Sequence, residues 1–195
     1  KRPFERTDFK NPAARALVHE ALGTVDLYME TFGQTIPDAL REFFQDHPKM
    51  ALAFSGGTDS AYLLYAARAC GCHVQAYYAA SPFQPAVELE DAKKLAVSLE
   101  AEMTILPLNV LELSAVRENP SDRCYHCKNA IFSRILEAAE KDGFQEVMDG
   151  TNASDDAGDR PGMRALRELR VLSPLRICGV TKKALREYSR NAGLF

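Results

Sequence analysis

The sequence predicts an α/β domain in which a doubly wound parallel sheet of about five strands is covered by helices on both faces. From residue 49 onward, short apolar segments of strand length alternate with longer segments whose apolar residues recur at helical spacing. The short segments are almost continuously apolar, which is typical of parallel strands buried on both faces. Right-handed crossovers between such strands place a ligand site at their carboxyl ends.

The composition is that of an ordinary soluble domain with a small extension. The chain has 195 residues, of which 46% are hydrophobic and 26% charged, and its net charge is -3. We find no apolar run of the roughly 18 residues that span a bilayer and no signal region, so we expect no membrane association. The sequence lacks a basic block, which argues against nucleic acid as the main partner. Five cysteines do not suit a disulfide framework, so we expect a cytoplasmic location.

Residues 1–47 predict a helical extension ahead of the sheet. Asn11-Pro12 is typical of an N-cap followed by proline at the first helical position, and apolar residues recur at spacings of three and four between Val18 and Phe32. A second, shorter helix is expected between residues 36 and 44. We expect this extension to serve as a cap or an interface.

Residues 48–195 predict five strands and five helices in alternation. The strands are expected at 50–54, 73–79, 102–108, 146–148 and 171–172. The helices are expected at 59–69, 88–100, 125–141, 161–169 and 181–192. The last helix begins after a Thr181 cap and ends at Gly193.

The segment Ser55-Gly56-Gly57-Thr58-Asp59-Ser60 joins the first strand to the first helix. Its glycines allow positive φ angles and remove Cβ atoms, so backbone N–H groups can converge on an oxyanion beside the helix N-terminus. Ser55 and Ser60 add hydroxyl groups. Asp59 would repel a phosphate unless a divalent cation lay between them, so the segment predicts a pyrophosphate site with Mg²⁺. The alternative is a plain turn capped by Thr58 or Asp59.

This segment resembles the PP-loop of the ATP pyrophosphatase superfamily, which includes NAD synthetases, GMP synthetases and tRNA-thiolating enzymes. These enzymes cleave ATP to AMP and pyrophosphate. The stretch "SPLRICGVTKKALREYSRNAGL" resembles their later Pro-Leu…Lys…Arg element, which implies that Lys182 contacts phosphate. A solvated lysine in the first turn of a helix is an equal alternative for Lys182. Ser81 and the backbone of Ala53 and Phe54 are expected near adenine or ribose.

Two further stretches, "NPSDRCYHCKNAIFSRI" and "DGTNASDDAGDRPGMRALRELRVLSPL", narrow the resemblance. Together with the PP-loop they closely resemble the LarE family of ATP-dependent sulfur transferases, over residues 49–194. The resemblance implies adenylation of a carboxylate of a pyridinium mononucleotide, followed by sulfur transfer to a thiocarboxylate, as in nickel-pincer cofactor synthesis. It also implies one of two sulfur sources, a sacrificed cysteine or a 4Fe–4S cluster.

Cys124 and Cys127 are the candidates for the sulfur step. A thiolate or sulfide must attack the acyl-adenylate, and the flanking cations Arg123 and Lys128 are expected to lower the pKa of these thiols. Two thiolates at this spacing also suit a metal or cluster. A pair of small residues at a helix start is the alternative.

The family has a further cysteine in an Ala-Cys-Leu-Ala-Ser type motif, which this sequence does not contain. We therefore expect either a truncated domain or a segment supplied by another polypeptide. Cys178 is a candidate third cluster ligand and equally a buried small residue. Cys70 and Cys72 follow an apolar helix face and are expected to be structural.

The polar loop between Gly150 and Gly162 follows a strand end and predicts a second group of site residues. Its candidates for holding Mg²⁺ or the adenylated group are Asp155, Asp156 and Asp159. Its candidates for binding substrate phosphate or carboxylates are Arg160 and Arg164. Thr151 and Asn152 are expected to contact nucleotide. The alternative is a solvated loop that caps the next helix at Pro161.

The sequence thus predicts an enzyme that uses ATP and Mg²⁺ to adenylate a small-molecule carboxylate and then transfers sulfur to it, and we expect a homo-oligomer. The candidate catalytic residues are Asp59, Cys124, Cys127, Asp155 and Arg160. The candidate nucleotide-binding residues are Ala53, Phe54, Ser55, Gly56, Gly57, Asp59, Ser60, Ser81, Arg123, Gly150, Thr151, Asn152, Arg164 and Lys182. The candidate metal ligands are Asp59 for Mg²⁺ and Cys124, Cys127 and Cys178 for the cluster. The alternatives are an ammonia-dependent ligase, a tRNA thiolase and a nucleotide-binding module without turnover.

Overall fold

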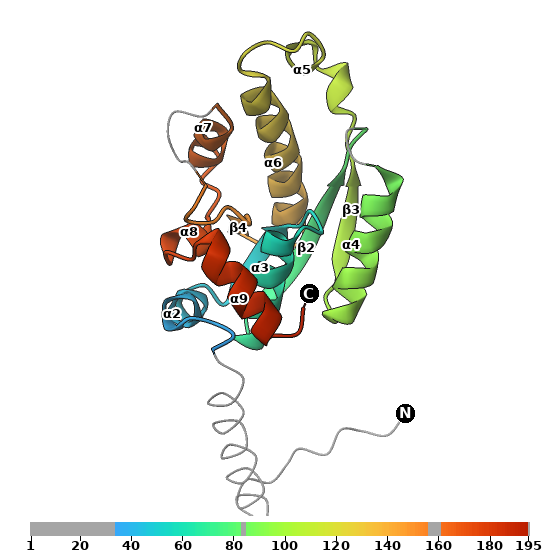
Figure 1. Ribbon diagram of the computed structural model, residues 1–195. Helices are drawn as coiled ribbons and strands as arrows, with labels where there is room; N and C mark the ends of the chain where they lie inside the picture. The colour runs from blue at the N-terminus through green and yellow to red at the C-terminus, as the bar shows by residue number, and fades with distance from the viewer. Residues whose placement is uncertain (1–33, 83–84, 156–160, 195) are drawn as a thin grey trace, which may run out of the picture.

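A parallel sheet with strand order β3-β2-β1-β4 forms the centre of the molecule (Figure 1). The structure is a computed structural model that describes residues 34–82, 85–155 and 161–194. Its strands are β1 (Lys49–Ala53), β2 (His73–Ala80), β3 (Met103–Pro107) and β4 (Val147–Met148). The expected strand at 171–172 is reduced to a single parallel bridge between Met148 and Leu172. The described part of the chain therefore has four strands, and the predicted fold class is confirmed.

Helices alternate with these strands close to the predicted positions. The longer ones are α2 (Asp38–Asp46), α3 (Thr58–Ala69), α4 (Ala86–Ser98), α6 (Arg123–Lys141), α7 (Pro161–Glu168) and α9 (Lys182–Asn191). Three short elements were not predicted, namely η1 (Val110–Glu112), α5 (Ser114–Arg117) and α8 (Pro174–Ile177). They have three or four residues each, too few to show a helical period. The helix expected between residues 18 and 32 lies outside the described residues.

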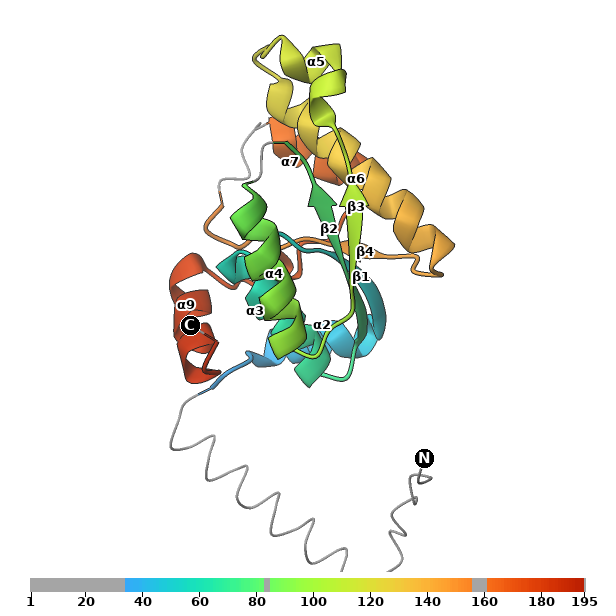
Figure 2. The same cartoon turned by 90° about the vertical axis from the view of Figure 1, so that its right-hand side faces the viewer.

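Neighbouring residues of each strand point into two different cores, as expected for a sheet covered on both faces. Met50 and Leu52 pack with α2, α3 and α4, whereas Ala51 packs with α6 and α7. On β2, Tyr78 packs in the same core as Met50, and Tyr77 packs in the same core as Ala51. Figure 2 shows α3 and α4 on one side of the strands and α6 on the other.

The segment that precedes β1 packs into the same core as α3. Leu40 and Phe44 of α2 are buried there, and the hydroxyl group of Tyr62 donates a hydrogen bond to the Thr35 carbonyl at 2.8 Å. His47 also contacts the Glu146 carboxylate, at 2.9 Å. The predicted division of the chain at residues 47 and 48 stays a prediction, because the first 33 residues are outside the description.

The carboxyl ends of β1, β2 and β4 meet at one edge of the sheet, as parallel strands require. The N-terminus of α3 lies at this edge because only four residues separate it from the end of β1. The N-terminus of α9 is brought to the same place, since Lys182 and Asp59 form an ion pair. In the described part of the chain, no helix combines the length and the apolar character needed to cross a membrane.

Candidate functional site

The turn between β1 and α3 is shaped by one glycine in the left-handed region. Gly56 uses the positive φ that glycine allows, with a φ of 75°, whereas Gly57 is an extended N-cap with a φ of -76°. A Cβ atom on Gly56 would lie 2.8 Å from the Cβ atom of Ala92. The turn therefore needs glycine at position 56 for its φ angle and for the close approach of α4.

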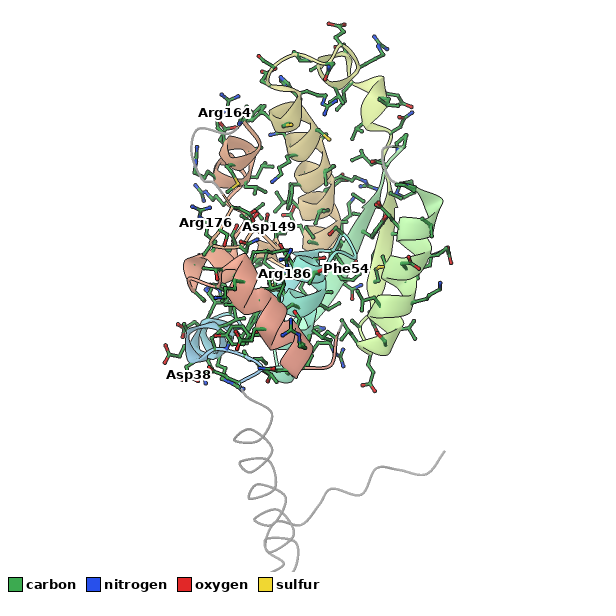
Figure 3. The ribbon with its side chains drawn as sticks, in the orientation of Figure 1. Asp38, Phe54, Asp149, Arg164, Arg176 and Arg186 are labelled. Carbon is green, nitrogen blue, oxygen red and sulfur yellow. The ribbon has the colours of Figure 1, made fainter. Side chains whose placement is uncertain are left out.

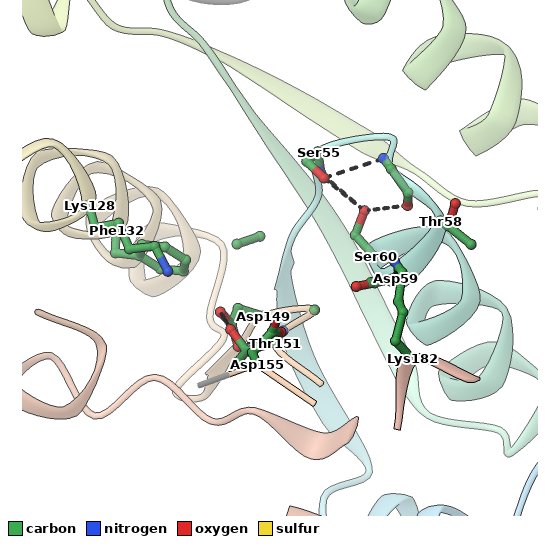
Figure 4. Close-up of a pocket in the computed structure, with 13 residues that line it drawn as sticks. Ser55, Thr58, Asp59, Ser60, Lys128, Phe132, Asp149, Thr151, Asp155 and Lys182 are labelled. Atoms are coloured by element: carbon green, nitrogen blue, oxygen red, sulfur yellow. Dashed lines mark hydrogen bonds and ion pairs between the residues drawn. The ribbon is translucent and has the colours of Figure 1, made fainter. Parts of the chain in front are cut away.

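Two serine hydroxyl groups hold this turn in place (Figure 4). The hydroxyl of Ser60 donates to the Gly57 carbonyl at 3.0 Å and lies 3.1 Å from the hydroxyl of Ser55. The backbone N–H of Gly57 donates to the Ser55 hydroxyl at 3.3 Å. The predicted hydroxyl groups are therefore at the turn, and they preorganise it.

Asp59, in the first turn of α3, joins three segments of the chain. Its carboxylate forms an ion pair with the ammonium group of Lys182 and accepts a hydrogen bond from the Asn152 side-chain amide at 3.1 Å. Three residues predicted from distant parts of the sequence thus meet at one point. The charge of Asp59 is balanced by Lys182.

Asp149, at the end of β4, was not predicted as a site residue. It is buried, and its carboxylate accepts hydrogen bonds from the hydroxyl groups of Ser173 at 2.6 Å and Thr151 at 2.5 Å. These bonds fix the loop that begins with Gly150, where an added Cβ atom would lie 3.0 Å from the backbone nitrogen of Ser60. The β4 loop is therefore pressed directly against the first turn of α3.

A cavity of about 420 Å³ lies between these segments and α6 (Figure 4). Lys128 and Phe132 of α6 form the wall opposite Ser55 and Asp59. Lys128 was expected only beside the cysteines, and Phe132 was not predicted. The lining residues are Ala53, Ser55, Gly57, Thr58, Asp59, Ser60, Lys128, Phe132, Asp149, Gly150, Thr151, Asp155 and Lys182. Two ammonium groups and a helix N-terminus suit an anion, and the carboxylates suit a divalent cation bound with it.

A second, more apolar cavity of about 300 Å³ adjoins the first and shares Ala53, Ser55 and Phe132 with it. It is lined further by Phe54, Tyr77, Ala79, Ser81, Cys127, Ile131 and Ile135. The structure thus brings the predicted residues Ala53, Phe54 and Ser81 together with the aromatic ring of Tyr77. An apolar cavity with an aromatic wall suits a planar base.

Cys124 and Cys127 lie in the first turns of α6 and line a third cavity of about 390 Å³ with Arg123 and Lys128. Cys124 is exposed and Cys127 is half-buried. Burial raises the pKa of the Cys127 thiol, and the nearby Arg123 guanidinium lowers it by less. The predicted lowering of this pKa by Arg123 is therefore present at Cys127, but burial outweighs it.

Cys178 does not join this pair. Its thiol, at the end of α8, donates to the Ala39 carbonyl of α2 at 3.3 Å, and burial raises its pKa. Among the residues that the structure describes, no three His, Cys, Asp or Glu side chains gather where they could hold a metal ion. Cys178 is thus placed as a packing residue against α2 instead of a third ligand of the pair.

The remaining cysteines fit their expected structural role. The buried thiol of Cys72 donates to the His47 carbonyl at 3.3 Å, and burial raises its pKa to about 11. Burial also raises the pKa of Cys70. Neither residue lines the cavities described above.

The N-terminus of α7 forms the wall of a fourth cavity of about 370 Å³. Its lining residues are Cys124, Lys128, Thr151, Asp155, Pro161, Gly162 and Met163. Arg164 faces elsewhere, because its guanidinium lies 4.1 Å from the centre of the Tyr125 ring and 3.7 Å from Glu168. The candidates Asp156, Asp159 and Arg160 lie outside the described residues.

Comparison with curated proteins places the chain among relatives of about 30% identity, although no known family model matches it. An uncharacterised protein of Synechocystis is 32% identical over 156 residues, which are 80% of this chain and 58% of the relative. The pyridinium-3,5-bisthiocarboxylic acid mononucleotide synthase of Lactiplantibacillus plantarum is 30% identical over 152 residues, 77% of this chain and 55% of that protein. The chain thus spans a little over half of these relatives, and the predicted resemblance to the LarE family is confirmed by a named homologue.

Solved structures share the fold at low sequence identity. The NH3-dependent NAD synthetase of Campylobacter jejuni superimposes with a TM-score of 0.60 at 17% identity, over 87% of this chain and 73% of that one. The glutamine-dependent NAD+ synthetase of Acinetobacter baumannii, in complex with ADP, superimposes with a TM-score of 0.59 at 18% identity. The match covers 77% of this chain and 30% of that one. These similarities show that the chain shares its α/β fold with the two NAD synthetases.

Proposed function

We propose that this chain, a homologue of a pyridinium-3,5-bisthiocarboxylic acid mononucleotide synthase, uses ATP to adenylate a carboxylate of a pyridinium mononucleotide and supports its conversion to a thiocarboxylate. The observation that carries the proposal is the pair of adjoining cavities at the carboxyl edge of the sheet. One is rich in charged groups and contains the Ser55–Ser60 turn, and the other is apolar. A triphosphate suits the first and an adenine ring suits the second.

The charged cavity is suited to the departure of pyrophosphate. The first N–H groups of α3 have no partners within the helix and point toward the turn, as at any helix N-terminus. Lys182 and Lys128 supply positive charge from opposite walls. Mg²⁺ held by Asp59 would neutralise the phosphates and free Lys182 to contact them. These groups stabilise negative charge as it develops on the leaving pyrophosphate.

The reaction has two displacements. A carboxylate oxygen of the substrate attacks the α-phosphorus of ATP, and the bond to the bridging oxygen breaks as pyrophosphate leaves with the electron pair. A sulfur nucleophile then attacks the acyl carbon, and AMP leaves with the electrons of the carbon–oxygen bond. Sulfide would give the thiocarboxylate directly. A cysteine thiolate would give a thioester, whose Cβ–Sγ bond must then break by elimination of the Cα proton, leaving a thiocarboxylate and a dehydroalanine. Cys124 and Cys127 lie on cavities that share lining residues with the charged one, so their thiols are the candidate groups for this second step.

Pyrophosphate release tests the proposal. The assay supplies ATP, Mg²⁺ and a pyridinium dicarboxylate mononucleotide, and compares the parent chain with Asp59→Asn. We expect release to fall by about 100-fold or more in the variant, because the carboxylate that would hold the cation is lost. Asp91→Asn is the matched control, since Asp91 lies on α4 and pairs with Lys94 away from the cavities.

The products separate the proposal from its alternatives. Pyrophosphate release that survives in Asp59→Asn would contradict the role of the turn. An amide formed from added ammonia, in place of a thiocarboxylate, would assign the chain to the ammonia-dependent ligases. If the parent chain bound ATP but released no pyrophosphate, the chain would be a nucleotide-binding module without turnover.

A further inference from the structure

Asn152 lies beside the charged cavity but does not line it. It is only 2% exposed, whereas Thr151 before it and Asp155 after it both line the cavity. Its backbone belongs to the loop that begins after Asp149, at the end of β4 (Figure 3). A buried amide is stable only when its polar atoms have hydrogen-bond partners, so the partners of Asn152 indicate its role.

The side-chain amide of Asn152 has a partner at each end. Its nitrogen donates a hydrogen bond to the Asp59 carboxylate at 3.1 Å, and its oxygen accepts one from the backbone N–H of Ser154 at 2.8 Å. A carboxylate can only accept and an N–H group can only donate, so these contacts fix the orientation of the amide. An aspartate at this position would face Asp59 with a like charge.

The backbone of Asn152 holds a second carboxylate of the cavity. Its N–H group donates to the Asp155 carboxylate at 2.8 Å, and the Asp155 N–H donates back to the Asn152 carbonyl at 3.2 Å. Arg176 of α8 (Figure 3) also donates to the Asp155 carbonyl, at 3.0 Å. One buried residue thus donates hydrogen bonds to two carboxylates, Asp59 and Asp155, that line the same cavity.

The two partners of Asp59 differ in their access to a ligand. Lys182 lines the cavity and its side chain is 37% exposed, so a bound anion can compete with Asp59 for its ammonium group (Figure 4). Asn152 is covered by its neighbours, so its amide would keep its hydrogen bond to Asp59 when Lys182 turns to a phosphate. Asn152 is therefore the partner that can hold the Asp59 carboxylate in place while a ligand binds.

We propose that Asn152 is a positioning residue that holds the carboxylates of Asp59 and Asp155 for the Mg²⁺ that accompanies ATP. The inference rests on the proposed function, because it needs ATP in the charged cavity. Two carboxylates on one cavity fit this ion, since Mg²⁺ at a nucleotide is usually bound by one or two carboxylates together with phosphate oxygens. Replacing a residue that orients metal ligands typically weakens metal binding by about 10- to 100-fold.

Isothermal titration with a non-hydrolysable ATP analogue, in the presence and absence of Mg²⁺, tests the inference without any turnover. The test variant is Asn152→Ala. The matched control is Asn191→Ala, because the Asn191 amide also donates at 3.1 Å, to the Gln34 carbonyl, and lines none of the cavities of the site. We expect the gain in affinity on adding Mg²⁺ to fall by about tenfold or more in the test variant. The affinity without Mg²⁺ should not change, and the control should match the parent chain.

The same titrations contain the results that would overturn the inference. If Asn152→Ala weakened binding of the analogue equally with and without Mg²⁺, Asn152 would serve only to fold the loop. If the gain from Mg²⁺ survived in full, Asn152 would not act on the metal ligands. Both results leave the proposed function intact, whereas a parent chain with no gain from Mg²⁺ would refute the metal role of Asp59 as well.

Amide NMR of the parent chain gives a second test that needs no variant. The inference predicts that the side-chain amide protons of Asn152 exchange slowly with solvent, both before and after the Mg²⁺-bound analogue is added. Fast exchange in the complex would show that Asn152 releases Asp59, and would contradict the inference.

Discussion

The ammonium group of Lys182 forms an ion pair with the carboxylate of Asp59, and this contact joins the first turn of α9 to the first turn of α3. The two residues are 123 positions apart, and both line the charged cavity. The charges of the two residues balance each other. A bound triphosphate with its cation would offer both residues new partners, so the pair is placed to exchange contacts when ATP binds.

Replacing Lys182 by Gln should weaken ATP binding by about tenfold, because a charge-assisted contact to phosphate is lost. Isothermal titration with Mg·ATP measures the effect. Lys183→Gln is the control, since Lys183 is exposed and does not line the charged cavity. An unchanged dissociation constant in Lys182→Gln would show that Lys182 serves only to balance Asp59.

Gly56→Ala should destabilise the fold by about 3 kcal/mol, because the new Cβ atom meets Ala92 and the backbone keeps a positive φ. Gly71→Ala is the matched control, since Gly71 has a similar φ of 78° and no heavy atom within 4 Å of the added Cβ. The control should lose only about 1 to 2 kcal/mol. Urea unfolding measures both values, and equal losses would contradict the proposed contact between the turn and α4.

Asp149→Ala should lower the free energy of unfolding by about 3 kcal/mol, because the hydroxyl groups of Ser173 and Thr151 lose the acceptor that they share. Ser173→Ala removes one donor and leaves the carboxylate its remaining partner, so about 1 kcal/mol is expected. Equilibrium unfolding compares the two variants. A larger loss in Ser173→Ala than in Asp149→Ala would refute the view that the carboxylate organises the loop.

The Cys127 thiol should react slowly with iodoacetamide at neutral pH. Burial raises its pKa, so less thiolate is present than in an ordinary cysteine, and the rate should keep rising above the usual pKa of about 8.5. Mass spectrometry in a Cys124→Ser background follows this single thiol. Arg123→Gln should move the profile to still higher pH, because the guanidinium lowers the pKa, whereas Arg134→Gln farther along α6 should not. A pH profile of the alkylation rate with its midpoint below the usual cysteine pKa would show that the flanking cations outweigh burial.

Local patterns were sufficient to predict the sheet, the longer helices and the turn that follows β1. Each of these depends on apolar periodicity or on residues adjacent in the sequence, as in the Ser55–Ser60 segment. The prediction of a fifth strand was wrong because Leu172 makes only one bridge, to Met148. The sequence does not show over how many residues two strands stay paired. The sequence did not show which of the two glycines takes the positive φ, because an N-cap such as Gly57 accepts glycine without requiring one.

The residues that line the cavities depend on contacts between distant segments, so they were harder to predict from the sequence. Lys128 and Phe132 line the charged cavity because α6 crosses the sheet next to β1. Lys128 was expected only as a cation beside the cysteines, and nothing in the local pattern of Phe132 distinguishes it from other helix residues. Asp149 had a detectable signal, since an aspartate directly after a buried strand needs hydrogen-bond donors. Cys178 follows the short helix α8, which was not predicted, and its thiol contacts the Ala39 carbonyl of α2.

A crystal structure with Mg²⁺ and a non-hydrolysable ATP analogue tests the central claim most directly. The account predicts that the β- and γ-phosphates contact the Ser55–Ser60 turn and Lys182, with the base in the apolar cavity beside Tyr77. A triphosphate bound outside the charged cavity, with the Asp59–Lys182 ion pair intact, would contradict the account.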